Sequence, residues 1–124
     1  MGTKSRQRVV QRLREVESRR AAVVDELAQT APLTIGSLSE VLRRCGKSSC
    51  HCASGSGHRQ AVFMSVADGR RRCQVIRQAD VAAVRELVRR YRAFREGLRQ
   101  LRTLDSKVLA LLRELMRLRD HSYE

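Results

Sequence analysis

The sequence predicts an α+β protein in which an N-terminal helix, a small segment with a β-hairpin and a long C-terminal helix follow one another. Three observations support this. Apolar residues recur at helical steps near both ends of the chain, and an Asp-Gly pair separates two strand-like runs. Cysteines and histidines gather within residues 45–58, ahead of these runs. The chain divides accordingly into residues 1–31, 32–77 and 78–124. With 124 residues and only two Phe and two Tyr, we expect one domain with a thin core.

The first helix is predicted over residues 6–29. Its apolar residues recur every three or four positions, which places them on one face, and Arg20 interrupts the stripe. The helix must end before Pro32, because the residue before a proline avoids helical dihedral angles. We expect the stripe to pack against the long helix that comes later. It consists of Val9, Leu13, Val16, Val23 or Val24, and Leu27.

Residues 33–44 are compatible with two structures. The run from Ser37 to Arg44 fits a short strand that leads into the cysteine-bearing segment. The adjacent Val41 and Leu42 fit a helical turn equally well. We favour the strand.

A β-hairpin is predicted where residues 60–67 and 70–77 flank Asp68-Gly69. An Asp-Gly pair between two strand-like runs is a strong hairpin signal, because both turn residues must accept positive φ. This turn sets the cross-strand register. We expect one inner face, formed by the pairs Val62–Val75 and Met64–Cys73.

From Asp80 to about Arg119 the chain reads as one helix, with Asp80 as its N-cap and no proline inside it. Its roughly 40 residues would span about 60 Å. Apolar residues alternate three- and four-residue steps, the heptad pattern of a coiled coil, and Asp105 takes the one polar position of that seam. We expect the helix to pair with the first helix, a second copy of the chain or another protein. The predicted partner surface consists of Leu87, Tyr91, Phe94, Leu98, Leu101, Val108, Leu112 and Leu115.

Three cysteines and two histidines fall within residues 45–58, among glycines and serines that let the backbone turn tightly. Thiolate and imidazole are ligands that Zn²⁺ takes four at a time in closed structural sites. Cysteine clusters in reducing compartments usually bind metal. We therefore predict a structural zinc ion in a small knuckle with the spacing C-x4-C-x-C-x5-H, held by Cys45, Cys50, Cys52 and His58.

Other interpretations of the cluster stay open. An iron–sulfur cluster would need a fourth thiolate, which only Cys73 can supply. A disulfide and reduced thiols without metal are further alternatives. His51 is a second imidazole, but it lies between two proposed ligands, where the chain would have to double back, so His58 is preferred. Cys73 itself fits a small buried hydrophobe in a strand.

The net charge of +13 points to a polyanionic partner, and nucleic acid is the usual one. Residues 32–77 hold eight Lys or Arg against two acids, and three arginines stand just past the predicted turn, where they would contact phosphates. A second basic stripe follows helical spacing on the long helix; a solvated surface is the alternative for both groups. The predicted nucleic-acid contacts are Arg43, Arg44, Lys47, Arg59, Arg70, Arg71, Arg72, Arg85, Arg89, Arg92 and Arg99.

The order of these features resembles a family of small bacterial proteins of unknown function, whose genes tend to lie near transposases and other mobile elements. The resemblance covers roughly residues 36–100, and members often carry an aromatic-rich strand after the histidine, where this chain offers only Phe63. It implies an accessory role beside a transposase or recombinase and no particular chemistry. The matching residues are Cys45-Gly46-Lys47, Cys50, Cys52-Ala53 and Gly57-His58.

We expect a nucleic-acid-binding accessory protein, with duplex DNA as the first partner and structured RNA as the second, because few aromatic residues are available to stack on single-stranded bases. The alternative is a non-catalytic interaction module whose long helix docks on an acidic protein or forms a homo-oligomer. We do not expect an enzyme, since no nuclease-like acidic cluster, phosphate-binding glycine loop or Ser-His-Asp signature occurs. No apolar run reaches the ~20 residues that span a bilayer, and the first residues lack a signal-peptide core, so we expect a cytoplasmic protein without a membrane partner.

Overall fold

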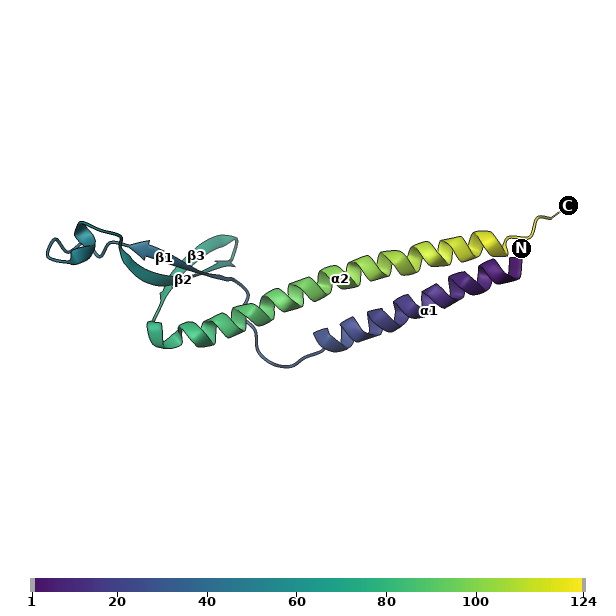
Figure 1. Ribbon diagram of the computed structural model, residues 1–124, viewed down its shortest axis with the longest axis horizontal. Helices are drawn as coiled ribbons and strands as arrows, with labels where there is room; N and C mark the ends of the chain where they lie inside the picture. Colours follow the sequence, from purple (N-terminus) through teal and green to yellow (C-terminus); the bar gives the residue numbers. More distant parts are fainter. Residues whose placement is uncertain (1, 124) are drawn as a thin grey trace. The chain divides into compact units, whose positions relative to one another are not determined.

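The computed structural model describes residues 2–123, and a helix, three strands and a second helix follow one another along the chain (Figure 1). The predicted α+β fold class is confirmed. Short 3-10 turns, η1 and η2, precede β2 and α2. The elements are α1 (Gly2–Leu27), β1 (Ser37–Arg43), η1 (His51–Ala53), β2 (His58–Ala67), β3 (Arg70–Ile76), η2 (Gln78–Asp80) and α2 (Val81–Arg119).

The chain forms two compact units, and helix α2 contributes to both. We call Ala31–Ala93 the sheet unit, because it holds the three strands and the first turns of α2. We call the residues up to Thr30, together with those from Phe94 onward, the helical unit. The predicted division into residues 1–31, 32–77 and 78–124 stays a prediction.

The sheet unit is built on an antiparallel sheet with the strand order β1-β2-β3. Asp68 and Gly69 form the turn between β2 and β3 with φ values of 53° and 74°, the positive values that this turn requires. The predicted register is confirmed, since Val62 lies opposite Val75 and Met64 opposite Cys73. The strand interpretation of residues 33–44 is confirmed for Ser37–Arg43, because β1 pairs with β2 along its whole length.

The predicted inner face of the hairpin is wrong for three of its four residues. Val62 is 4% exposed, but Met64 and Val75 are 37% and 55% exposed, and Cys73 is exposed as well. The better covered face is the opposite one. Because β2 and β3 carry apolar residues on both faces, the alternation of polar and apolar residues does not show which face is buried. Its buried or half-buried members are Leu38, Ala61, Phe63 and Ile76.

The first turns of α2 are fixed within the sheet unit. Val81 and Val88 are 7% and 3% exposed. The segment before β1 is tied to the same turns, because the backbone N–H of Thr34 donates to the carbonyl oxygen of Leu87 at 3.1 Å. The guanidinium of Arg90 donates to the carbonyl oxygen of Pro32 at 2.9 Å. These contacts hold the helix start and the strand start together.

In the helical unit, α1 runs antiparallel to the second part of α2 (Figure 1). Arg20 contacts Asp105, whereas Leu27, further along α1, lies against Gly97, earlier in α2. The packing predicted for the apolar stripe of α1 is confirmed: Val23 is fully buried, and Val24 is exposed. The two polar interruptions of the predicted seams, Arg20 and Asp105, pair with each other at 2.7 Å.

Only part of the apolar seam predicted on α2 is buried or half-buried. Leu104 and Leu111 are buried, although the heptad assignment left them out, whereas Phe94, Leu98 and Leu112 are exposed. The apolar face of α2 is wider than one seam, so a single heptad register cannot describe it. Neither helix offers, within residues 2–123, a stretch long and apolar enough to cross a membrane.

Candidate metal centre

The cysteines and histidines of the central segment lie in the loop that joins β1 to β2. Cys45 follows the last residue of β1 by two positions, and His58 is the first residue of β2. Arg43 pairs with His58 in the strand register, so the two strands bring both ends of the loop to the same edge. The sheet therefore sets the distance between the first and the last candidate ligand.

The loop itself is folded by short-range backbone hydrogen bonds. Gly46 has a φ of 82°, a conformation that favours glycine, and starts the turn after Cys45. The N–H of Cys50 then donates to the carbonyl oxygen of Lys47 at 3.1 Å, and the N–H of Ala53 donates to that of Cys50 at 3.1 Å. These turns point three successive thiols toward one another.

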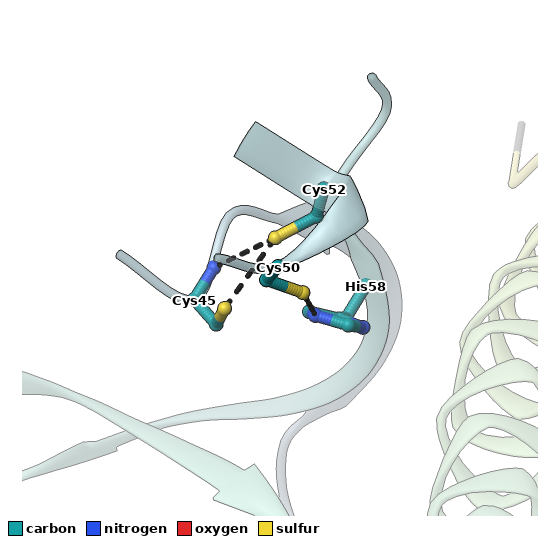
Figure 2. Close-up of side chains that lie close together, drawn as sticks. All are labelled: Cys45, Cys50, Cys52 and His58. Carbon is teal, nitrogen blue, oxygen red and sulfur yellow. Dashed lines mark hydrogen bonds between the residues drawn. The ribbon is translucent and has the colours of Figure 1, made fainter. Parts of the chain in front are cut away.

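Four side chains converge in this loop (Figure 2). The Sγ atoms of Cys45, Cys50 and Cys52 and a ring nitrogen of His58 all lie within 4.8 Å of one another. The Sγ atoms of Cys45 and Cys52 are 3.4 Å apart, and Sγ of Cys50 lies 3.1 Å from Nε2 of His58. Tetrahedral zinc, with bonds of about 2.0–2.3 Å, separates its ligand atoms by roughly 3.5–3.8 Å, so this cluster can hold a metal ion.

The electrostatics of the cluster favour the ligand forms of two thiols. The pKa of Cys45 is lowered to about 6, first by a hydrogen bond from the backbone N–H of Lys47 and then by contacts with Cys52 and His58. The pKa of Cys50 is lowered chiefly by the backbone N–H and the thiol of Cys52. Hydrogen bonds to Cys45 and Cys50 raise the pKa of His58. Thiolates are the form that binds metal.

Cys52 is the buried member of the four. Its Sγ accepts a hydrogen bond from the backbone N–H of Cys45 at 3.4 Å. That bond favours its thiolate, but burial and the neighbouring thiols of Cys45 and Cys50 raise its pKa overall. A cation placed between the sulfurs would remove this repulsion, because it favours every thiolate at once.

The two other candidate ligands lie outside this set. Nδ1 of His51 is 3.8 Å from Sγ of Cys50, and its ring packs edge-on against that of His58 with centroids 5.3 Å apart. Cys73 is an exposed residue of β3, so the interpretation as a buried hydrophobe is wrong, and it supplies no fourth thiolate to the cluster. All four cysteines are free thiols.

Sequence reasoning missed the role of Gly57. A Cβ atom at this position would lie 2.2–2.6 Å from backbone atoms of Arg43, closer than packed atoms ever approach. The glycine therefore lets the returning chain touch the end of β1, directly before the ligand His58. The Gly57-His58 pair was visible in the sequence, but the close approach depends on the pairing of two strands.

The residues predicted to contact nucleic acid fall into two groups, those without an acidic neighbour and those with one. In β3, Arg70 and Arg72 lie on one face and Arg71 on the other, since successive strand residues alternate, and all three are exposed. Among the described residues these three have no acidic partner, and the same holds for the remaining members of this group. Those members are Arg43, Arg44, Lys47 and Arg92.

The other predicted contacts already have an acidic neighbour. Glu40 binds Arg85 at 3.0 Å and Arg59 at 3.6 Å. Arg89 donates to Glu86 at 2.8 Å, and Arg99 pairs with Glu96 in the helical unit. The basic stripe on α2 is thus largely neutralised, and its contact with nucleic acid stays a prediction.

The family model for a domain of unknown function, DUF6788, matches residues 13–86. This range covers the second half of α1, the whole cysteine–histidine loop, the sheet and the start of α2. No curated protein and no solved structure matches the chain.

Proposed function

This chain belongs to the DUF6788 family, a domain of unknown function, and we propose that it is a non-catalytic accessory protein that binds nucleic acid through the sheet unit. In this proposal a structural zinc ion holds the loop between β1 and β2. The observation that carries it is the unpaired positive charge on the same unit as the Cys45, Cys50, Cys52 and His58 cluster.

The donor set supports zinc as the ion. Three thiolates with one imidazole form one of the usual tetrahedral structural zinc sites, and soft thiolates disfavour calcium and magnesium. When bound, the ion would neutralise the repulsion among the three sulfurs and close the loop. Four protein ligands complete the tetrahedron, so the site would offer no open position to a substrate, which supports a structural role and no catalysis.

The charge of the sheet unit supports a polyanionic ligand. Residues 31–93 contain twelve Lys and Arg and four acids, a net charge of +8. Arg70, Arg71 and Arg72 follow the tight turn at one end of the sheet. Arg43, Arg44 and Lys47 lie beside or within residues 44–57, the loop between β1 and β2, which we call the metal loop. Such a surface attracts the phosphate backbone, which supplies affinity with little reading of sequence.

Duplex DNA is the first expected ligand and structured RNA the second. Recognition of single strands relies on stacking of bases on aromatic side chains, and Phe63, half-buried on the better covered face of the sheet, is the one aromatic residue of the strands. The resemblance to proteins encoded near transposases supports a role as an accessory to a transposase or recombinase.

The proposal is tested by the affinity of the full, zinc-loaded chain for a labelled duplex of arbitrary sequence at several salt concentrations. We expect a linear fall of log affinity with log salt, with a slope of about −0.9 for each phosphate contacted. Replacing Arg70, Arg71 and Arg72 together by Ala should reduce that slope. The matched control replaces Arg8, Arg12 and Arg14 of α1 and removes the same charge from the helical unit.

Equal loss of slope in both triple variants would mean that overall charge and not the sheet surface drives binding. Micromolar or weaker binding even at low salt would reject the nucleic-acid proposal. The same basic surface would then serve an acidic protein partner.

A further inference from the structure

Helix α2 carries a second apolar stripe in the helical unit, beside the seam that packs on α1. At about 100° per residue the members of this stripe fall within an arc of about 60°. They are exposed, whereas Leu104 and Leu111 of the neighbouring seam are buried. The members, with their exposed fractions, are Phe94 (36%), Leu98 (47%), Leu109 (52%), Leu112 (44%) and Met116 (65%).

One ion pair lies within the stripe, and α1 also exposes an apolar residue. Val24 of α1 is 38% exposed. Asp105 lies in the same arc as the stripe and binds Arg20 of α1 at 2.7 Å, and the two side chains are 48% and 39% exposed. An exposed apolar band about 33 Å long, from Phe94 to Met116, marks an interaction surface more often than a solvated one.

The spacing of the stripe is symmetric about Asp105. Leu98 and Leu112 each lie seven residues from it, and Phe94 and Met116 each lie eleven residues from it. If two such helices cross antiparallel at Asp105, Leu98 meets Leu112 of the second copy and Phe94 meets Met116. The surface is therefore complementary to itself.

We propose that this stripe binds the same stripe of a second copy of the chain, antiparallel and centred on Asp105, so that two helical pairs form a four-helix bundle. A two-helix unit has little apolar interior of its own: its buried apolar residues within the described chain are Val9, Val23, Leu104 and Leu111. In a four-helix arrangement the exposed stripe would be buried in an apolar core shared by both copies.

The charge distribution selects the antiparallel direction. Residues 2–14 and 106–120 form one end of the helical unit and hold nine Lys and Arg against two acids, a net charge of +7. Residues 15–30 and 94–105 form the other end and hold five against six, a net charge of −1. A parallel dimer would bring the two +7 ends together, whereas the antiparallel dimer places each beside a −1 end.

The Arg20–Asp105 pair takes a defined role in this dimer. The pairs from both copies would meet at the two-fold axis and lose water, so each charge would need the others as partners. A polar group at one position of an apolar seam fixes register, because any shift would leave a buried charge unpaired.

The test uses purified full-length protein, and it is independent of nucleic-acid binding. Sedimentation equilibrium should give twice the mass of the chain. The variant with Leu98→Asp and Leu112→Asp should be monomeric, whereas Ile35→Asp, at a 68% exposed position of the sheet unit, should remain dimeric. A monomeric wild-type chain, or a double variant that still dimerises, would overturn the proposal.

A photo-crosslinking amino acid in place of Leu98 tests the direction without relying on a charged variant that misfolds. Leu98 and Leu112 lie about 21 Å apart along one helix, so a crosslink between them joins two chains. We expect crosslinked peptides that contain residue 112. Crosslinks of residue 98 to residue 98 would mean a parallel dimer and would overturn the antiparallel assignment.

Discussion

The two units of this chain differ in their net charge and in what their ion pairs connect. The sheet unit carries twelve Lys and Arg against four acids, and its arginine run Arg70–Arg72 has no acidic partner among the described residues. The helical unit carries fourteen against nine, and its ion pair Arg20–Asp105 joins two helices. In the helical unit one ion pair joins the two helices, whereas the sheet unit has the larger net charge, +8 against +5, and its ion pairs among the described residues involve only Glu40 and Glu86.

The units also differ in what holds them together. The helical unit packs apolar side chains such as Val23 and Leu104 between two helices. In the metal loop of the sheet unit, residues 44–57, Cys52 is the buried residue. A loop without apolar side chains to bury needs another source of order, and a metal ion held by the four converging side chains would supply it.

Loss of one metal ligand should have the largest effect. In Cys50→Ser the proposed zinc ion would lose a thiolate, so we expect loss of bound zinc and of amide-exchange protection across residues 43–58, since structural zinc contributes roughly 10 kcal/mol or more to folding. Metal content and hydrogen exchange measure this. Cys73→Ser is the matched control, because Cys73 lies exposed outside the cluster and should keep the metal. Full zinc content in Cys50→Ser would remove that thiol from the ligand set.

Removal of a buried leucine should destabilise the helical unit. Leu104 is 9% exposed, and its replacement by Ala should lower the free energy of unfolding by about 3 kcal/mol, through lost burial and the cavity left behind. Leu42→Ala, at a 62% exposed position, should change it by less than about 0.5 kcal/mol. Denaturant titration followed by circular dichroism compares the two variants. Equal effects would mean that α1 and α2 are not packed through Leu104.

A methyl group at Gly57 should disturb the metal loop without removing a ligand. The new Cβ would lie 2.2 Å from the backbone of Arg43, so the strand ends must separate, at a cost of about 2 kcal/mol. Zinc affinity should fall accordingly in a chelator competition. Gly55→Ala provides the control, because its Cβ would meet its nearest neighbour at an ordinary 3.7 Å. Unchanged affinity in Gly57→Ala would show that the loop is positioned by other contacts.

The Arg20–Asp105 pair should contribute least within one chain. Both side chains are more than a third exposed, so solvent screens the pair. A double-mutant cycle with Arg20→Gln and Asp105→Asn, measured at dilute concentration, should give a coupling of about 0.5 kcal/mol. The cycle should weaken further in high salt. A coupling above about 2 kcal/mol would mean that the pair is already buried at that dilution.

The parts of the fold that sequence predicts well depend on local chemistry. The Asp68-Gly69 turn fixes the hairpin register, and cysteine spacing finds the ligand cluster, because both signals lie within a few residues. The better covered face of the sheet carries Glu40, which pairs with Arg85 of α2, and α2 lies elsewhere in the chain. The burial of Leu104 and the partners of Arg20 and Gly57 could not be predicted from sequence for the same reason. Each depends on contacts between segments that only the folded chain brings together, either two helices or two paired strands.

If phosphate contacts fall on the sheet unit, as we propose, chemical modification of arginine should reveal them residue by residue. The zinc-loaded chain is treated with phenylglyoxal with and without a duplex, and modified arginines are quantified by mass spectrometry. We expect the duplex to protect Arg43, Arg44 and Arg70–Arg72 several-fold while Arg8, Arg12 and Arg14 of α1 react as before. Protection confined to α1, or spread evenly over both units, would contradict binding through the sheet unit.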